Sequence, residues 1–408
     1  MNMIFAVILA IFVIDFCFSR TLSLLNMHNA SAPVPDILAD IYNKDRYAFQ
    51  QRYLRTNAKF GWIIVTFRFV LILTLLLCDG FAWLDALVRS WTTCELLVSL
   101  LFFGILFVAN NLLILPFQIY IIFVIETKFG FNRTTVKTFV FDKLKNLLIK
   151  LLIGGVLFTA IILIYEQIPD YFWLVAWAVV SAFSLFMSLF YSELIVPLFN
   201  KQTPLEAGEL RDAIEQFAHK ANFGLKDIYV IDSSKRSTKA NAYFTGWGHK
   251  KRIVLYDTLI KQLTTDEIVA VLAHEIGHNK RHHVPKNIAL SLSINLLLFI
   301  LLGWMLGSDA LAQALGCQHA SFHINLMAFL LLYTPVNTLL GLASNALSRK
   351  HEYQADAFVK QNGYAPQLIT ALKKIAAHAL NNLTPHPWYV FVHYSHPTLY
   401  QRITALLA

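Results

Sequence analysis

The sequence predicts an α-helical polytopic membrane protein with seven transmembrane helices and a small α+β domain at the cytoplasmic face. Hydrophobic residues make up 57% of its 408 positions and charged residues only 14%, whereas soluble proteins contain roughly 45–50% and about 25%. The apolar residues gather in long stretches, and a polar segment of domain size separates the fifth stretch from the sixth. This composition and order indicate a chain that crosses the bilayer repeatedly.

Seven apolar stretches are candidate transmembrane helices, because most of them reach the roughly 20 residues that cross a bilayer. They cover residues 3–18, 60–78, 96–125, 147–165, 171–198, 288–306 and 324–343. The first stretch is short enough for a signal peptide, but the residues before it carry no positive charge and Arg20 follows it. This polarity favours a retained helix whose N-terminus lies outside.

Basic residues are distributed unevenly among the predicted loops. The 19–59 segment carries six Lys or Arg and the 126–146 loop carries five, whereas the 79–95 loop has one. The 166–170 and 307–323 loops have none. Because cytoplasmic loops are enriched in Lys and Arg, the N-terminus is predicted outside and the C-terminus in the cytoplasm. The same loops explain the net charge of +9, so no nucleic-acid partner is predicted.

The longest polar segment, residues 200–287, is predicted to form the small α+β domain. Residues 206–221 have a helical pattern, and short strands are expected at 227–231, 239–245 and 252–256. Four parts are therefore predicted along the chain: transmembrane helices one to five (1–199), this insert (200–287), helices six and seven (288–343) and a cytoplasmic C-terminal segment (344–408).

The motif H-E-I-G-H at 274–278 is the most informative feature of the insert. It follows Thr264 and Glu267, whose spacing is that of a capping box at the start of a helix. An apolar run lies between this box and the motif. The motif is therefore expected on a well-formed helix, which is the context that its chemistry requires.

His274 and His278 lie four residues apart, so both can turn a ring nitrogen toward one metal ion from the same helix face. Glu275 lies one position round the helix and can reach a water on that metal without being a ligand. Two imidazoles, a third ligand, an open position for water and a carboxylate base are the requirements of a zinc hydrolase. The expected cofactor is one Zn²⁺ ion, which makes the insert a candidate zinc metalloprotease domain.

Glu352 is the predicted third ligand, on geometric grounds. His278 lies ten residues before the sixth apolar stretch, and Glu352 lies nine residues after the seventh. Equal offsets from the same membrane face put both at similar heights, if both extensions stay helical. Asp356 shares the face of Glu352 and is expected to orient a ligating imidazole through a hydrogen bond, with Arg349 also near the ligands.

Two other histidines are weaker candidates for ligands. His282 continues the face of the motif, but a straight helix places it about 6 Å beyond His278, too far for one ion to bind all three. His351 is next to Glu352 and is expected to point elsewhere. A basic collar at the membrane interface is the simpler interpretation of His282, His283 and the Lys and Arg residues beside them.

With the H-E-I-G-H motif and the segment around Glu352, the chain resembles the integral-membrane CAAX prenyl proteases of the gluzincin type. The resemblance lies in several fragments, in the order in which the family has them: I-E-T-K-F-G-F-N-R-T-T at 125–135, P-L-F-N-K at 197–201, N-A-Y-F at 241–244, the H-E-I-G-H motif, the segment around Glu352, and S-H-P at 395–397. It implies seven helices around a large intramembrane chamber, with the zinc site at the cytoplasmic end.

The resemblance also implies roles for Asn241 and His396, which would line the substrate path and help to stabilise the oxyanion. The implied reaction is hydrolysis of a peptide bond near the C-terminus of a prenylated, lipid-anchored peptide or protein, with Glu275 as the base. Asn241 by itself is a polar residue on a predicted edge strand, where a peptide can add by β-augmentation. Substrate and membrane lipid are the expected partners.

Two other functions stay open at this point. A broader zinc protease that removes damaged membrane proteins would use the same site on different substrates. A transporter or receptor with a vestigial metal site would not need Glu275, since a structural zinc prefers four protein ligands. The sequence does not decide the natural substrate, the oligomeric state, or whether the membrane is a bacterial inner membrane or the endoplasmic reticulum.

Overall fold

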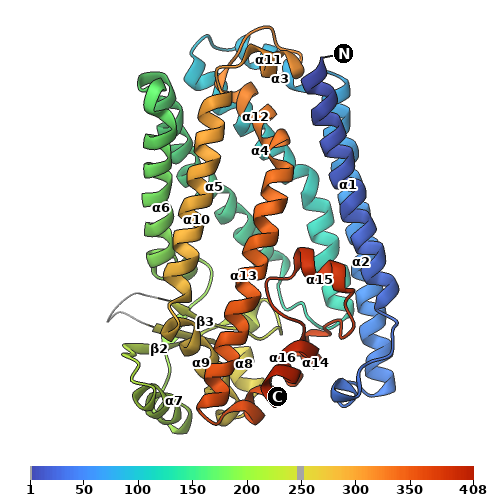
Figure 1. Cartoon of the computed structure of the whole chain (residues 1–408), viewed down its shortest axis with the longest axis vertical. Coiled ribbons are helices and arrows are strands. Elements are labelled where there is room, and N and C mark those ends of the chain that lie inside the picture. Colours follow the sequence, from blue (N-terminus) through green and yellow to red (C-terminus); the bar gives the residue numbers. More distant parts are fainter. Residues whose placement is uncertain (1, 246–251) are drawn as a thin grey trace.

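The computed structural model describes residues 2–245 and 252–408, and its long helices run side by side as one bundle (Figure 1). Among the described residues, six helices are long and apolar enough to cross a membrane. They are α1 (Met3–Asn29), α2 (Lys44–Leu77), α4 (Glu95–Tyr120) with the π-helical turn η2 (Ile121–Glu126), α5 (Val136–Gln167), α6 (Phe172–Leu194) and α10 (His283–Met305).

The candidate for a seventh span is a bent pair of helices. α12 (Phe322–Leu332) and α13 (Thr334–Gln361) meet at Tyr333 with a bend of 53°. Pro335 lies in the first turn of α13, where its missing N–H and its ring prevent α12 from continuing straight. The predicted polytopic fold is thus confirmed, with up to seven spans in the described part of the chain.

The end of the bundle that holds the N-terminus is closed by two short helices, α3 (Gly80–Arg89) and α11 (Asp309–Ala314) (Figure 1). Leu84 of α3 and Leu311 of α11 are buried with Phe102 of α4 in one apolar cluster. The sequence patterns treat both segments only as loops, because a helix of one to three turns has too few positions to display a period.

The opposite end of the bundle carries a four-stranded sheet in the order β1-β2-β4-β3. Its strands are β1 (Gln202–Pro204), β2 (Asp227–Ile231), β3 (Ala242–Thr245) and β4 (Arg252–Tyr256). β2 and β4 pair in parallel, and β3 runs antiparallel to β4 at the edge. The three predicted strands are confirmed, although β3 begins at 242 rather than 239. The sequence gives no signal for β1, which has three residues and ends in a proline.

Helix α9 lies at the centre of the domain around this sheet, and nine of its 16 residues are buried. The helices of the domain are α7 (Glu209–Lys220), α8 (Asp257–Gln262), α9 (Thr265–Lys280), α14 (Ala365–Ala379) and α16 (Leu399–Leu407). The short helix α15 (Pro387–His393) packs against α13 and α1. Ile268 and Leu272 of α9 are buried in one cluster with Ile214 of α7 and Leu368 of α14. Residues from both ends of the chain's second half therefore build one core.

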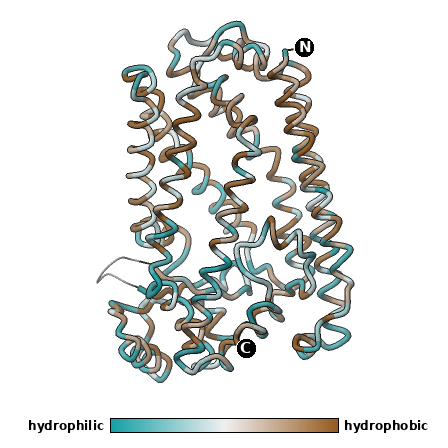
Figure 2. Tube along the Cα trace, viewed as in Figure 1, coloured by the Kyte–Doolittle hydropathy of each residue, from teal (hydrophilic) through white to brown (hydrophobic). Residues whose placement is uncertain are grey.

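Hydropathy separates the two parts of the molecule (Figure 2). The long helices are largely hydrophobic along their length, whereas hydrophilic and hydrophobic residues alternate closely around the sheet. Polar contacts join the parts: Arg236 pairs with Asp142 of α5 at 2.7 Å and donates to the carbonyl oxygen of Phe199. Lys239 pairs with Glu126 at the end of η2 at 2.9 Å. These contacts fix the strand-bearing segment to the ends of the membrane helices.

Candidate active site and metal centre

Helix α9 carries both histidines of the motif and is fixed at its start by side-chain contacts. Thr264 Oγ1 accepts a hydrogen bond from the backbone N–H of Glu267, and the Glu267 carboxylate accepts one from Thr264 N at 2.8 Å, so the predicted capping box is present. Lys374 of α14 forms an ion pair with Glu267 at 2.7 Å. Further along the helix, the Nε2 atoms of His274 and His278 lie 3.1 Å apart.

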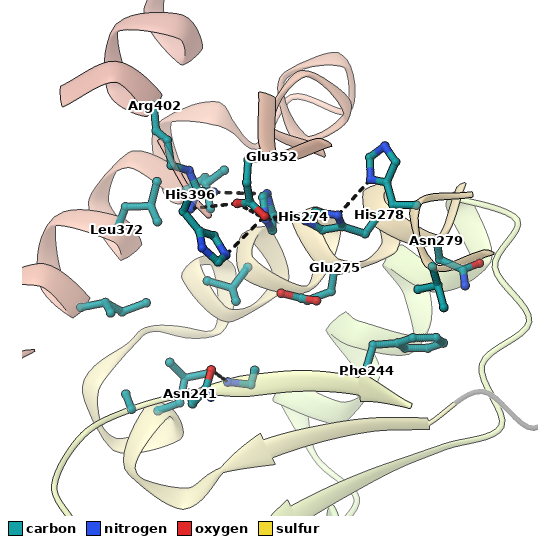
Figure 3. Close-up of a pocket in the computed structure, with 18 of the residues that line it drawn as sticks. Asn241, Phe244, His274, Glu275, His278, Asn279, Glu352, Leu372, His396 and Arg402 are labelled. Carbon is teal, nitrogen blue, oxygen red and sulfur yellow. Dashed lines mark hydrogen bonds and ion pairs between the residues drawn. The ribbon is translucent and has the colours of Figure 1, made fainter. Parts of the chain in front are cut away.

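Helix α13 can approach this face because α9 has a glycine there. A Cβ atom on Gly277 would lie 3.2 Å from backbone atoms of Ala355. The close approach places Glu352 Oε2 3.3 Å from His274 Nε2 and Glu352 Oε1 3.2 Å from His278 Nε2. Ligand atoms of the three residues lie within 4.8 Å of one another, and the side chains converge in Figure 3. Glu352 thus lies next to the two motif histidines, as its distance from the membrane face predicts.

The three side chains fit a metal ion better than they fit one another. The Nε2 atoms of His274 and His278 face each other at 3.1 Å, although both offer a lone pair when each ring carries its proton on Nδ1. Glu352 Oε2 is buried and makes no hydrogen bond. A cation between two imidazole nitrogens and a carboxylate satisfies all three groups, and this donor set is typical of catalytic zinc.

Asp356 lies behind His274, where its Oδ1 is 2.8 Å from Nδ1 of the ring. Arg402 of α16 donates two hydrogen bonds to the same carboxylate, at 2.6 and 2.8 Å. Burial lowers the pKa of the His274 imidazole, but its contacts with the carboxylates of Asp356 and Glu352 outweigh burial and raise the pKa overall. Since a metal binds the neutral ring, protons compete with the metal at low pH.

Arg349 does not lie near the ligands, and this part of the prediction is wrong. Its guanidinium donates to the carbonyl oxygens of Phe391 at 3.3 Å and Tyr394 at 2.6 Å. It therefore holds the chain that leads to His396, and the guanidinium beside Asp356 is that of Arg402. The sequence offers no signal for Arg402, because it lies outside every motif and 46 residues beyond its partner.

The extension from α9 toward the sixth span is not one continuous helix. α9 ends at Lys280 and α10 begins at His283, and His282 between them has a left-handed backbone with φ of 56°. The break turns the exposed His282 away from the face that it would continue in a straight helix. His283 is only 1% exposed, so its side chain lies inside the protein and not in the basic collar predicted at the membrane interface. His351 stacks on His283 with ring centroids 4.0 Å apart.

A cleft of about 410 Å³ opens in front of the metal ligands. Glu275 of α9, Asn241 at the start of β3 and His396 of the C-terminal segment all line it (Figure 3). His396 Nε2 lies 3.4 Å from Glu352 Oε1, and Asn241 lies on the opposite, sheet side of the cleft. Residues far apart in the sequence are thus placed around one small volume.

Two family models match the chain and together cover most of it. The model described as CAAX prenyl protease N-terminal, five membrane helices, matches residues 23–201. The model described as Peptidase family M48 matches residues 204–408. The first match runs from the end of α1 through α6, and the second covers strands β2 to β4, the three metal ligands and His396.

Individual proteins give the same result. The probable CAAX prenyl protease 1 of Schizosaccharomyces pombe is 36% identical over 387 residues, covering 91% of this chain and 81% of that protein. CAAX prenyl protease 1 of Saccharomyces cerevisiae is 35% identical over 400 residues, covering 91% and 88%. The crystal structure of S. mikatae Ste24p superposes with a TM-score of 0.94 at 33% identity, covering 99% of both chains.

Proposed function

Because the chain belongs to the CAAX prenyl protease 1 family of integral-membrane M48 metallopeptidases, we propose that it cleaves prenylated proteins near their C-terminus with one zinc ion. His274, His278 and Glu352 hold the ion. The observation that carries this assignment is the convergence of two Nε2 atoms and one buried carboxylate within 4.8 Å. Membership in a protease family argues against a transporter or receptor with a vestigial metal site.

Glu275 is the proposed general base. The chemistry that a bound zinc ion supplies is Lewis-acid polarisation of the scissile carbonyl and of a water molecule. Glu275 is half-buried in the cleft beside the ligands but is not one of them. Its carboxylate accepts the proton of the attacking water and then delivers it to the leaving amine, as a single base near the reaction centre can do.

Asn241 and His396 are the proposed donors to the oxyanion of the tetrahedral intermediate. The Oδ1 atom of Asn241 accepts the N–H of Ala242 at 2.9 Å, which leaves its amide N–H groups for another acceptor. His396 Nδ1 pairs with Ser395 Oγ at 2.9 Å, and Nε2 faces the cleft beside Glu352. Donors placed before the reaction stabilise developing negative charge without reorganisation.

Strand β3 is the proposed docking edge for the substrate backbone. It pairs with β4 on one side and ends the sheet on the other. Asn241 directly precedes it, so a peptide added along this edge by β-augmentation passes between the strand and the metal ligands. Specificity would then come from side-chain pockets of the cleft and from the lipid of the substrate.

Two substitutions test the assignment of the zinc site. Glu275→Gln removes the base and keeps the ligands, so we expect full zinc content with turnover reduced about 100- to 10,000-fold. Glu352→Ala removes a ligand, so we expect loss of both zinc and turnover. Metal analysis of the purified proteins and cleavage of a labelled peptide measure both quantities. Stoichiometric zinc in Glu352→Ala, or near-normal cleavage by Glu275→Gln, would contradict the assigned roles.

The prenyl requirement needs a separate measurement. A lipid chain buried in the membrane contributes about 0.8 kcal/mol per methylene, so a farnesylated peptide should have a much higher kcat/KM than the same peptide without the lipid. Both are compared in one detergent. Equal values would favour the broader membrane-protein protease, and would leave the zinc chemistry unchanged.

The proposed location is the endoplasmic reticulum membrane, with the protease domain and C-terminus in the cytoplasm. It is supported by the basic residues of the 19–59 and 126–146 loops and by the eukaryotic sources of the relatives. In an Ala408→Cys variant, we expect the cysteine at position 408 to be labelled from the cytoplasmic side and not from the lumen.

A further inference from the structure

We infer that His283 is a positioning residue that fixes the ring tautomer of the ligand His278 and thereby slows the release of zinc. The inference rests on the proposed zinc site. It concerns a histidine outside the H-E-I-G-H motif, at the first position of α10. The side chain of Gln354 on α13 completes the arrangement, so three separate helices take part.

The contacts form a continuous chain away from the metal ligands. His278 turns Nε2 toward Glu352 and His274, and its other ring nitrogen, Nδ1, lies 2.9 Å from Nδ1 of His283. On the far side of the second ring, His283 Nε2 lies 2.8 Å from Gln354 Oε1. His283 is 1% exposed, so water does not readily replace either partner.

The positions of the protons follow from these contacts. When Nε2 of His278 binds a metal, a neutral ring must carry its proton on Nδ1. His278 then donates to His283 Nδ1, which must be a bare acceptor. The proton of His283 is consequently on Nε2, where the side-chain oxygen of Gln354 accepts it. Each group in the hydrogen-bond chain has one role, and the opposite tautomer of His283 would set two N–H groups against each other.

The ring of His283 is also held in its plane. His351 stacks on it with an interplanar angle of 11° and a centroid distance of 4.0 Å. The left-handed residue His282 ends the first helix and lets α10 start in a new direction. A continuous helix through residue 282 would carry His283 away from His278, so the break that interrupts the helix also creates the contact.

The two histidine ligands therefore have different partners. His274 is backed by the carboxylate of Asp356, whose charge Arg402 balances. His278 is backed by a neutral imidazole. A carboxylate partner makes a ligating ring more basic than a neutral one does. His278 is thus the ligand whose hold on zinc depends on a precise hydrogen bond rather than on a nearby charge.

Zinc release from the purified holoenzyme tests the role of His283. His283→Phe keeps the ring stacked on His351 and removes the acceptor, and we expect zinc to pass to a chelator about 10- to 100-fold faster, the usual range when the partner of a ligand is lost. His283→Asn restores an acceptor near the position of Nδ1, and most of the retention should return. His282→Asn is the matched control, since it changes the neighbouring histidine and suits a left-handed backbone; its release rate should equal that of the wild type.

Cobalt substitution gives a second readout. The visible absorption bands of the Co²⁺ enzyme should shift in His283→Phe and stay unchanged in His282→Asn, because only the first alters the ligand His278. If His283→Phe does not fold, His283→Ala takes its place beside His283→Asn under the same criteria.

The failure of this inference can be told from the failure of the zinc assignment. A wild-type protein without bound zinc would contradict the proposed function. Wild-type zinc content together with unchanged release from His283→Phe would contradict only the role of His283. Equally fast release from His283→Phe and His283→Asn would also overturn it, since ring packing and not the acceptor would then matter.

Discussion

Helix α9 and the membrane helices are stabilised in opposite ways. Nine of the 16 residues of α9 are buried, whereas α2 buries two of its 34 residues and α5 two of its 32. The exposed apolar side chains of the long helices suit contact with lipid, where burial against protein gives no hydrophobic gain. α9 is fixed by close packing on several sides, whereas the long helices pack on one another over part of their surface and expose the rest.

This difference matches the tasks of the two parts. Ligands for a metal must be held within about 0.5 Å of their working geometry, and dense packing around α9 supplies that. The long helices expose many apolar side chains, which suits the lipid-anchored substrate proposed above. The polar pairs of Arg236 and Lys239 join the two parts without extending the rigid core into the membrane.

The largest effect that tests this contrast is expected at the contact between α9 and α13. Gly277→Val places atoms against the backbone of Ala355, which cannot move aside as a side chain does. Overpacking of this kind typically costs about 1–3 kcal/mol, and it should also displace Glu352 and reduce zinc content. Thermal unfolding and metal analysis measure both effects.

Gly341→Val is the matched control, in the part of α13 that belongs to the predicted seventh span. A Cβ atom there meets nothing within 4 Å, so zinc content and stability should stay close to those of the wild type. If both substitutions were equally harmful, the long helices would be packed as tightly as α9, and the contrast between the two parts would disappear.

A smaller overall effect, on stability without loss of zinc, is expected at the junction. Arg236→Met leaves the Asp142 carboxylate, which is 20% exposed, without its partner. Hydrogen bonds to charged groups contribute about 1.5–3 kcal/mol, so the protease domain should unfold at lower denaturant concentration. Lys261→Met is the control, because Lys261 is 72% exposed and lies 3.9 Å from its partner, where a pair contributes less than about 1 kcal/mol. Equal midpoints for the two variants would show that the junction does not stabilise the domain.

The same contrast explains how much of the molecule the sequence predicts. Thr264, Glu267 and the two motif histidines interact within one helix, so their spacing alone predicts a capped helix with two ligands on one face. Glu352 can be predicted because it and His278 lie at similar distances along the chain from the same face of the membrane. Such arguments assume continuous helices, and here they hold although α9 and α10 are separated at His282 and the seventh span is bent at Tyr333.

Contacts between elements could not be predicted in this way. Arg402 reaches Asp356 only because α16 packs across α13, and His283 reaches His278 only because of the left-handed residue at 282. The short helices α3 and α11 depend on their packing at the end of the bundle. In each case the deciding fact is a tertiary contact or one backbone angle, and no local pattern records it.

The smallest expected effect is a pH dependence that acts on the protease domain and spares the membrane helices. Burial raises the pKa of the Glu267 carboxyl, but its contacts with Lys374 and with the N–H of Thr264 outweigh burial, so the pKa is lowered overall. Because the pKa is lower in the folded state, the carboxylate stabilises the fold at pH values above its pKa in the unfolded chain, which is about 4.3. This contribution is lost as the pH falls through the lower pKa of the folded state.

Glu267→Gln tests the effect, because it removes the titrating group and keeps a side chain that can still cap the helix. Between pH 7 and the acid range, the wild-type domain should lose up to about 1 kcal/mol more stability than Glu267→Gln, because only the wild type loses a charge paired with Lys374. Chemical unfolding at several pH values gives the difference, and circular dichroism follows the long helices in the same samples. An identical pH dependence in the two proteins would mean that α9 is held by its apolar contacts alone. A loss of helix from the membrane spans over the same pH range would mean that the two parts unfold as one unit.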